Sequence, residues 1–461
     1  EPGTTVIAAA ERLGIDIPRF CHHPALPPAG SCRMCVVEIE GAAKLAPSCA
    51  TEAAEGMVVR TDTPRVAEAR RQALEFLLLN HPLDCPVCDK AGECSLQDYY
   101  MAYSRAKSRF DAADKERRQK RRLIGPHLVL DNERCVLCTR CVRFCDEVTR
   151  THELFVSGRS DASFVDIREG KALDNGYSLN LADICPVGAL TSRDFRFKQR
   201  VWFLQSTPVV CPGCATGCEA EAHHEGGVIY RMVPRPGGAN RWLCDHGRLG
   251  CKALRAGDRL SKGVIKNGLI DLDPAVREAA ARLAAAPGAA VLGSPWLSVE
   301  DNAALAALAK ALRTENFSFD LPAEQGIKDG ILINKDPAPN TAGAAEVRAA
   351  AGGLSLGELA DRVASGRVKA VITEARAASF LAGALKSGPR LIVFATNRGQ
   401  VPPGTYATLP YADYFETAGT YIDYRGVRRL TAPVVPPPEG VRPLAEVAGL
   451  IAAEVAKVGG I

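Results

Sequence analysis

Apolar residues follow a clear pattern beyond about residue 261. Alanine-rich stretches with helical spacing alternate with short runs of β-branched residues. The predicted helices cover residues 275–286, 300–313, 356–364, 376–386 and 444–457, and the predicted strands cover residues 289–293, 369–374 and 390–396. Alternation of this kind predicts a parallel sheet flanked by helices. A proline-rich stretch, APVVPPPEGVRP, comes before the last helix and predicts an extended linker.

The preceding part of the chain has shorter elements and more loops. A helix is predicted over residues 5–13 with no strand before it, so we expect an opening hairpin to be missing from this sequence. Short β runs are predicted at 36–40 and 57–61, and a strand at 228–233. A longer helix over residues 63–79 has a proline in its first turn and a single apolar stripe.

Composition and charge are ordinary for a folded protein of several domains. The chain has 461 residues, of which 47% are hydrophobic and 24% charged, and its net charge of +4 gives no argument for nucleic-acid binding. The one dense basic run, KERRQKRR at residues 115–122, has no interleaved aromatic residues. This favours a solvated face over a docking surface for an acidic partner or for nucleic acid. No apolar run approaches the ~18–20 residues of a membrane span.

Cysteines carry most of the chemical information. All 17 lie between Cys21 and Cys251, and many form tight Cys-x2-Cys pairs. A Cys-x2-Cys turn places two sulfurs on one side of a loop, where they can share a metal or a cluster. Thiols at this density favour a reducing compartment in which most sulfurs are metallated, rather than a set of disulfides.

The densest stretch begins with HPLDCPVCDKAGEC and predicts a first iron–sulfur cubane. The proposed ligands are His81, Cys85, Cys88 and Cys94. An imidazole is neutral where a thiolate is negative, so it would shift the reduction potential and could couple it to a proton. The alternative is that His81 only caps the C-terminus of the preceding helix, where a cationic ring suits the helix dipole.

A second cubane is predicted from CVLCTRCVRFC, which has the spacing of bacterial ferredoxins. In those proteins the fourth cysteine is followed by proline. Cys145 is followed by Asp146, whereas Cys185 is followed by Pro186. The predicted [4Fe–4S] ligands are therefore Cys135, Cys138, Cys141 and Cys185. Cys145 is predicted to be a buried spare thiol.

Two further groups of four cysteines flank these motifs. Four thiolates with one tight pair fit a [2Fe–2S] cluster on a β-grasp ferredoxin domain, and these are Cys21, Cys32, Cys35 and Cys49. A third cubane is predicted at Cys211, Cys214, Cys218 and Cys244. A structural zinc ion is the alternative at both sites. This assignment leaves Cys145 and Cys251 without a cluster.

Three motifs together resemble a known family. CHHPALPPAGSCRMC, HPLDCPVCDKAGECSLQD and DICPVGALTS are similar to the large iron–sulfur subunit, the G subunit, of bacterial NADH–quinone oxidoreductase (respiratory complex I). The resemblance covers about residues 1–260. Beyond them, residues 412–429 resemble a late segment of the molybdopterin oxidoreductase fold. About 200 residues are too few for a full domain of that kind, so we expect no molybdopterin.

The resemblance implies one [2Fe–2S] and three [4Fe–4S] clusters on the residues named above. It also implies an FMN- and NADH-binding partner, a ferredoxin-like cubane partner, other peripheral-arm subunits, and a position on the cytoplasmic side of the bacterial inner membrane. The expected fold is a multidomain α+β chain. Three domains are expected in the N-terminal part: a [2Fe–2S] domain at residues 1–62, a [4Fe–4S] domain with one histidine and three cysteine ligands at 63–122, and a ferredoxin-like [4Fe–4S] domain at 123–200. A molybdopterin-oxidoreductase-type [4Fe–4S] domain is expected at 201–260, and a shortened α/β domain without cofactor at 261–461.

The expected function is that of an electron relay from an NADH/FMN subunit towards quinone, within an enzyme complex and without a substrate site of its own. The first three motifs also occur in relay subunits of soluble NAD-linked hydrogenases and formate dehydrogenases, which are the alternative. A zinc-stapled interaction protein is a third, more distant alternative.

Overall fold

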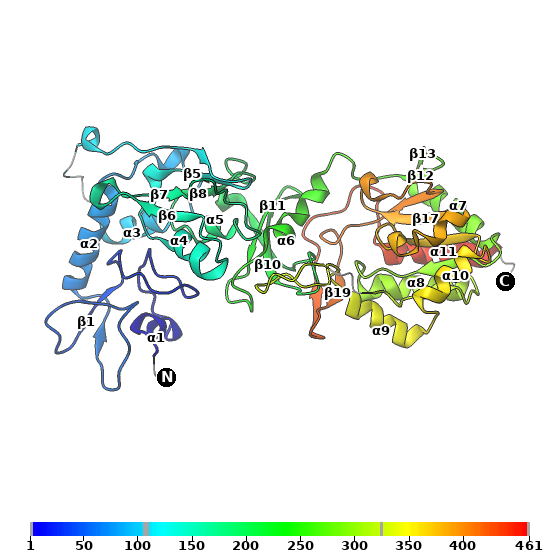
Figure 1. Ribbon diagram of the computed structural model, residues 1–461, viewed down its shortest axis with the longest axis horizontal. Helices are drawn as coiled ribbons and strands as arrows, with labels where there is room; N and C mark the ends of the chain where they lie inside the picture. Colours follow the sequence, from blue (N-terminus) through cyan, green and yellow to red (C-terminus); the bar gives the residue numbers. More distant parts are fainter. Residues whose placement is uncertain (1–2, 105–108, 110, 323–325, 459–461) are drawn as a thin grey trace. The chain divides into compact units, whose positions relative to one another are not determined.

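Two compact units make up the chain. The computed structural model describes residues 3–104, 109, 111–322 and 326–458. The first unit comprises Glu1–Leu204 and the second Gln205–Ile461 (Figure 1). The five expected domains remain a prediction within this division.

The N-terminal end of the first unit is a small sheet with two helices. Strand β1 (Val36–Ile39) lies between β2 (Ala46–Pro47) and β3 (Val59–Arg60), and both pairings are antiparallel. Helices α1 (Val6–Arg12) and α2 (Pro64–Leu78) begin at threonine caps, Thr5 and Thr63, whose hydroxyls accept backbone N–H groups. The predicted helices and β runs of this region are confirmed.

The remainder of the first unit consists of short elements joined by loops. Helix α3 spans Ser95–Tyr103, α4 Arg140–Arg143 and α5 Asn180–Ile184. Strands β4 (Arg122–Leu123), β5 (Leu128–Leu130) and β8 (Leu190–Ser192) form one antiparallel sheet, and β6 (Leu154–Ser157) pairs with β7 (Phe164–Ile167). These elements bring the loops that carry the predicted ligands together.

The second unit opens with a three-stranded antiparallel sheet. Its strands are β9 (Gln205–Val210), β10 (Glu219–Glu225) and β11 (Val228–Pro234), and α6 (Asp245–Leu249) follows. A hairpin of β19 (Gly419–Ile422) and β20 (Arg428–Thr431) forms later in the chain. Cys211 and Cys218 pack in the same apolar core as Val434 and Val435.

A seven-stranded sheet forms the rest of the second unit, in the order β13-β12-β18-β17-β16-β14-β15. The strands are β12 (Gly263–Ile265), β13 (Gly268–Ile270), β14 (Ala290–Leu292), β15 (Phe317–Ser318), β16 (Ala370–Glu374), β17 (Arg390–Ala395) and β18 (Ala407–Pro410). The five strands from β18 to β15 are parallel, and β12 and β13 add an antiparallel edge.

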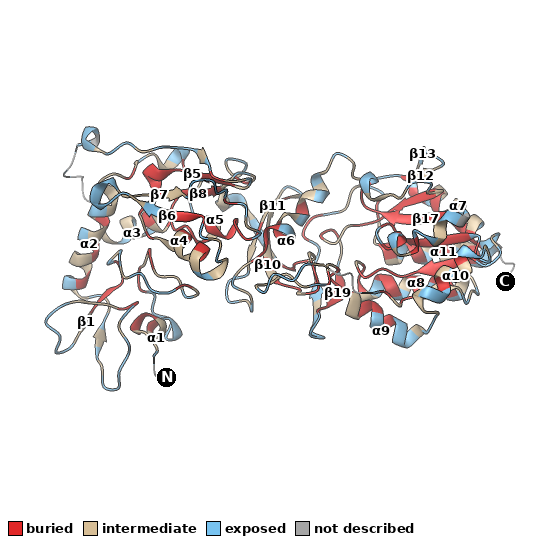
Figure 2. Cartoon of the chain, in the orientation of Figure 1, coloured by how far each residue is buried: buried red, intermediate tan, exposed pale blue. Residues whose placement is uncertain are grey.

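Helices cover both faces of this sheet, as Figure 2 shows by the burial of its central strands. They are α7 (Leu272–Ala284), α8 (Val299–Ala311), α9 (Thr341–Ala351), α10 (Leu356–Ala364) and α11 (Leu444–Val458). Residues of α7, α8 and α11 belong to one large apolar core, and residues of α10 to another. The expected parallel sheet flanked by helices is confirmed.

One prediction for this region is wrong. Residues 376–386 form two short 3-10 segments, Ala377–Leu381 and Ala384–Ser387, instead of an α-helix. Gly383 falls between the two segments, and glycine weakens a helix interior. The proline-rich stretch at 432–443 has no helix or strand and joins β20 to α11, as expected of an extended linker; it is packed in place, since Val434 and Val435 are buried and the Val434 N–H donates to the Phe415 carbonyl.

Candidate functional site

All 17 cysteines are free thiols, and 14 of them are buried. The three that are half-buried are Cys32, Cys85 and Cys135. The sequence-based preference for unpaired sulfurs over disulfides is therefore confirmed. Each predicted ligand group lies within a single unit of the structure.

The first cysteine group consists of Cys21, Cys32 and Cys35, which precede β1, and Cys49, which follows β2. The Cys21 N–H points at the Cys32 sulfur, 3.5 Å away. Hydrogen bonds from the Cys32 and Cys49 thiols lower the pKa of Cys21, and a hydrogen bond from Cys49 lowers the pKa of Cys35 to about 6. The sulfurs of this group therefore lie within hydrogen-bonding reach of one another, Cys21 beside Cys32 and Cys49, and Cys35 beside Cys49. Anionic sulfur is the form that binds iron.

His81 and its three cysteines line one hollow of the first unit. His81 follows α2, Cys85 and Cys88 belong to a tight turn after it, and Cys94 is the residue before α3. The hollow brings the four side chains together even though they come from different elements. Arg134 and Gly188, from distant parts of the sequence, line the same hollow.

The imidazole of His81 is kept neutral. Burial, together with the nearby positive charges of Arg134 and Lys115, lowers the pKa of His81 to about 4. Its Nδ1 atom is buried and has no hydrogen-bond partner among the described residues. A neutral, unpartnered imidazole nitrogen is the form that ligates a metal.

Lys115 takes the capping role that the alternative interpretation gave to His81. Its Nζ atom donates to the carbonyls of Leu78, Leu79 and His81 at 2.8, 2.8 and 3.0 Å. These acceptors lie at the C-terminus of α2, where a cation is favourable. The His81 ring is therefore not needed as the cap.

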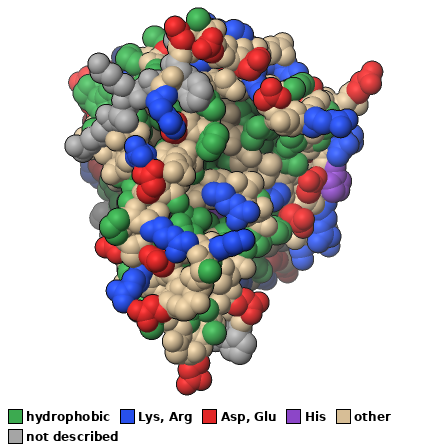
Figure 3. All heavy atoms as spheres, turned by 90° about the vertical axis from the view of Figure 1, so that its left-hand side faces the viewer, with side chains coloured by type: hydrophobic (Ala, Val, Ile, Leu, Met, Phe, Trp, Pro, Cys, Tyr) green, Lys and Arg blue, Asp and Glu red, His purple; other side chains and the backbone are tan. Residues whose placement is uncertain are grey.

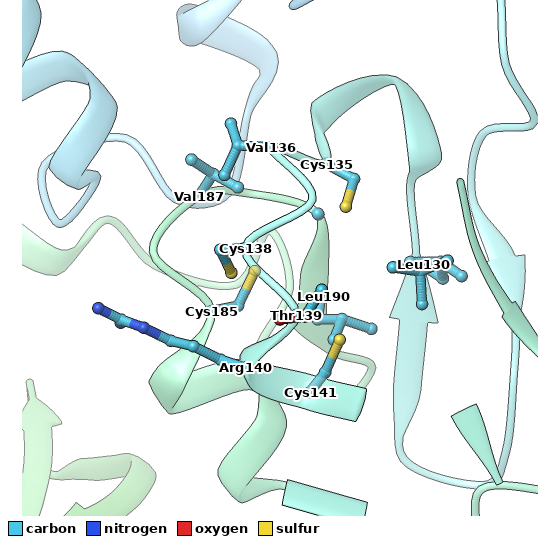
Figure 4. Close-up of a pocket in the computed structure, with 12 residues that line it drawn as sticks. Leu130, Cys135, Val136, Cys138, Thr139, Arg140, Cys141, Cys185, Val187 and Leu190 are labelled. Carbon is cyan, nitrogen blue, oxygen red and sulfur yellow. The ribbon is translucent and has the colours of Figure 1, made fainter. Parts of the chain in front are cut away.

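Four cysteines line a small apolar cavity together with residues of α4, β5, β7 and β8, and Figure 4 shows this cavity. They are Cys135, Cys138, Cys141 and Cys185. Burial raises the pKa of Cys135 to about 12, and burial with the charge of Cys185 raises the pKa of Cys138 to about 11. Thiolates gathered in an apolar cavity repel one another, and iron supplies the positive charge that would stabilise them.

Cys145 is placed differently from those four. It is fully buried, lies in a π-helical turn (Phe144–Val148), and is not among the residues that line the cavity. Burial and the charge of Glu153 raise its pKa. This position is compatible with the predicted spare thiol.

The fourth group lies in the second unit, between β9, β10 and α6. Its members are Cys211, Cys214, Cys218 and Cys244. The Cys244 sulfur accepts the Gly247 N–H at 3.3 Å, and a Cβ on Gly247 would lie 2.4 Å from the Cys211 sulfur. Burial, together with the charges of Cys214 and Cys244, raises the pKa of Cys218 to about 12. Because residue 247 is a glycine, the loop of Cys244 can lie directly against the Cys211 sulfur.

The basic run at 115–122 lies on the surface of the first unit, and some of its side chains make contacts within that unit. Arg118 donates to the carbonyls of Asp161 and Ser163, Lys120 pairs with Glu133 at 2.5 Å, and Arg122 pairs with Asp166. Residues 116, 117 and 119–121 are exposed, as expected of a solvated face, while the half-buried Lys115, Arg118 and Arg122 also make contacts within the unit. On the protein face in Figure 3, charges of both signs are interspersed.

The described residues contain neither a membrane-spanning helix nor a compact site for a single metal ion. No helix in the part of the chain that the structure describes is long and apolar enough to cross a membrane. Among residues 3–104, 109, 111–322 and 326–458, no group of three or more His, Cys, Asp or Glu side chains is arranged to hold a metal ion.

Three family profiles match the first unit. A 2Fe-2S iron-sulfur cluster binding domain matches residues 1–64, and an NADH-ubiquinone oxidoreductase-G iron-sulfur binding region matches residues 70–109. The ferredoxin-like domain of NADH-quinone oxidoreductase subunit 3 matches residues 125–191. The first unit thus contains a 2Fe–2S domain, an oxidoreductase-G 4Fe–4S region and a ferredoxin-like domain.

Curated relatives extend the similarity into the second unit. The G subunit of NADH-quinone oxidoreductase from Streptomyces coelicolor is 42% identical over 328 residues, which are 69% of this chain and 39% of that protein. The mitochondrial NADH dehydrogenase [ubiquinone] iron-sulfur protein 1 of Solanum tuberosum is 42% identical over 266 residues, 57% of this chain and 36% of that protein. The chain thus spans less than two fifths of either relative's length.

A solved structure is also similar to part of the chain. It is the crystal structure of an NAD+-reducing [NiFe]-hydrogenase in the H2-reduced state, with 36% sequence identity. The match covers 44% of this chain and 86% of that one, with a TM-score of 0.39.

Proposed function

We propose, because the chain belongs to the family of NADH–quinone oxidoreductase G subunits, that it relays single electrons through iron–sulfur clusters from an NADH- and FMN-binding partner towards quinone. The observation that carries this proposal is the gathering of four separate groups of buried soft ligands on loops. The first three groups lie in the parts of the chain that match iron–sulfur domains.

Each ligand group has one proposed cluster. The [2Fe–2S] cluster is held by Cys21, Cys32, Cys35 and Cys49. The three [4Fe–4S] clusters are held by His81, Cys85, Cys88 and Cys94, by Cys135, Cys138, Cys141 and Cys185, and by Cys211, Cys214, Cys218 and Cys244. When bound, such clusters accept and release one electron at a time.

The chain itself supplies the environment of each cluster. Buried cysteines and apolar walls exclude water, as at the cavity of Cys135, where Leu130, Val165 and Leu190 form part of the lining. Hydrogen bonds to sulfur, such as that from Gly247 to Cys244, favour the reduced state and so raise a potential. The charge of a ligand also affects the reduction potential: neutral His81 in place of an anionic thiolate favours the reduced state and so raises the potential.

The sheet of the second unit is proposed to be a shortened molybdopterin-oxidoreductase-like domain without its cofactor. In parallel sheets of this kind a ligand binds at the carboxyl ends of the strands where the strand order reverses. In this sheet the strand order reverses between β14 and β16, and side chains of the chain itself lie at the carboxyl ends of these two strands. Ser294 donates to Glu374 at 2.9 Å, and Arg376 lies over the ring of Trp296.

The proposed partners follow from the family. They are an FMN- and NADH-binding subunit that supplies electrons, a ferredoxin-like cubane subunit that accepts them, and other peripheral-arm subunits of complex I. The chain is proposed to lie on the cytoplasmic side of the bacterial inner membrane as a peripheral subunit, and to contact the membrane only through these partners.

The relay can be tested by following the visible absorbance of the protein during reduction. The chain is purified anaerobically, alone and with its flavoprotein partner, and NADH is added to each. We expect the clusters to bleach only when the flavoprotein is present, and dithionite to bleach both samples. Bleaching by NADH alone would show a nucleotide site on this chain. Bleaching by dithionite but never by NADH with the flavoprotein would contradict the relay.

A further inference from the structure

A buried arginine joins two of the proposed cluster sites. Arg134 directly precedes Cys135, and its side chain is only 7% exposed. Its guanidinium reaches out of the Cys135 loop to Asp84, the residue before Cys85, with nitrogens 2.7 and 2.9 Å from the two carboxylate oxygens. The same guanidinium pairs with buried Asp131 at 3.2 Å. One cation thus binds both cluster loops.

The two loops interlock around this arginine. Gly188 lies three residues after Cys185, and a Cβ added there would stand 2.4 Å from the Cys88 sulfur and 3.3 Å from the Arg134 side chain. The Ser95 N–H donates to the Pro186 carbonyl at 3.1 Å, beside Cys94 and Cys185 respectively. The backbone that holds one cubane is therefore in contact with a ligand of the other.

Arg134 is the cation that pairs with both carboxylates at this junction, those of Asp84 and Asp131. Its side chain lines the same hollow as the proposed ligands His81 and Cys88. The Asp131 side chain is buried, whereas that of Asp84 is 38% exposed. Without Arg134, Asp131 on the Cys135 loop and Asp84 next to Cys85 would both lose their cation, and negative charge disfavours an added electron.

We propose that Arg134 is a positioning residue for two cluster sites at once, and that its charge raises the reduction potentials of both the His81 centre and the Cys135 centre. This inference rests on the proposed electron relay. Through the contacts above, Arg134 joins the two ligand loops and compensates the carboxylates of Asp84 and Asp131. The effect is larger at the His81 centre, because Asp84 adjoins its ligand Cys85.

The experiment is an EPR-monitored redox titration of the full chain, purified anaerobically, together with iron and sulfide analysis. The variants are Arg134→Gln, Arg134→Lys and the double variant Asp84→Asn/Arg134→Gln. Arg143→Gln is the matched control. Arg143 comes from the same cysteine motif, but it contacts the carbonyls of Cys21, Pro27 and Cys138 instead of the His81 loop.

The expected result is that Arg134→Gln shifts both midpoint potentials to more negative values, and the His81 centre further. Arg134→Lys keeps both near wild type, and removal of the Asp84 charge in the double variant reverses most of the shift. Arg143→Gln leaves the His81 midpoint unchanged. A His81 midpoint that does not move in Arg134→Gln, or a Cys135 midpoint that does not move, would overturn the proposal.

If Arg134→Gln loses cluster iron, the double variant identifies the cause. If the unpaired Asp84 carboxylate is the cause, Asp84→Asn/Arg134→Gln regains the iron, which supports the proposal. If the double variant loses it as well, Arg134 acts only as a packing element and the proposal fails. Wild-type protein without sulfide would instead refute the relay itself, which is a separate result.

Discussion

At the scale of single residues, the chemistry of the chain depends on which side chain stands at a ligand position. His81 is the one nitrogen donor among the proposed ligands. Its pKa of about 4 keeps the ring neutral at physiological pH. The charge of each ligand set is therefore a direct control on the potential of its cluster.

His81→Cys is expected to retain a cubane and to lower its midpoint potential, because an anionic thiolate replaces a neutral ring and disfavours the reduced state. An EPR-monitored redox titration measures the change, and the [2Fe–2S] midpoint of the same sample is the internal control. An unchanged midpoint for the cubane would refute the assignment of His81 as a ligand.

Cys145→Ala and Cys185→Ala form a matched pair of substitutions. Cys185 lines the cavity of its cysteine group, whereas Cys145 is buried outside it. We expect Cys145→Ala to keep its full iron content and Cys185→Ala to lose about four irons per chain. Iron and sulfide analysis decides between them. The reverse pattern would mean that Cys145 is the fourth ligand.

Cysteine spacing could predict which residues gather, because ligands of one cluster must lie on a few tight turns. It could not predict the residues that join one loop to another. Lys115 belongs to a charge run that looks solvated, and Gly188 is one glycine among 41. Their roles depend on contacts with residues far away in the sequence, so no local pattern marks them.

At the scale of elements, the helix that precedes His81 depends on a charge supplied from another segment. Lys115→Gln removes charged hydrogen bonds to the end of α2, which is expected to cost about 2 kcal/mol locally. Amide hydrogen exchange at residues 75–81 should then become more than tenfold faster. Lys44→Gln on an exposed loop is the control. Equal exchange in the two variants would show that Lys115 does not hold the helix.

Elements with strong patterns could be predicted, and short ones could not. The expected strand at 369–374 appears as β16, a strand buried along its whole length. The β19–β20 hairpin has only four residues in each strand and no regular alternation, so its pairing is set by packing. The segment at 376–386 has an apolar helical pattern, but a glycine between two single turns prevents one continuous helix.

At the scale of the whole molecule, the two units should depend on iron to different degrees. The first unit contains three of the four ligand groups and consists mainly of loops, whereas the sheet of the second unit has its own large apolar cores. Metal sites of this kind contribute directly to folding.

Removal of iron with a chelator is therefore expected to make the first unit sensitive to proteases while the sheet stays resistant. Limited proteolysis followed by mass spectrometry should yield a stable fragment that begins near residue 260. Holoprotein treated in parallel is the control. Apoprotein that is digested evenly along its length would argue against an independent core in the second unit.

The central claim is that these sulfurs and one imidazole hold iron–sulfur clusters. The most direct measurement is metal and sulfide analysis of anaerobically purified protein, combined with an EPR spectrum after dithionite reduction. The account predicts about fourteen irons and as many sulfides per chain, with one binuclear signal and cubane signals. Colourless protein that contains zinc and no sulfide would contradict it.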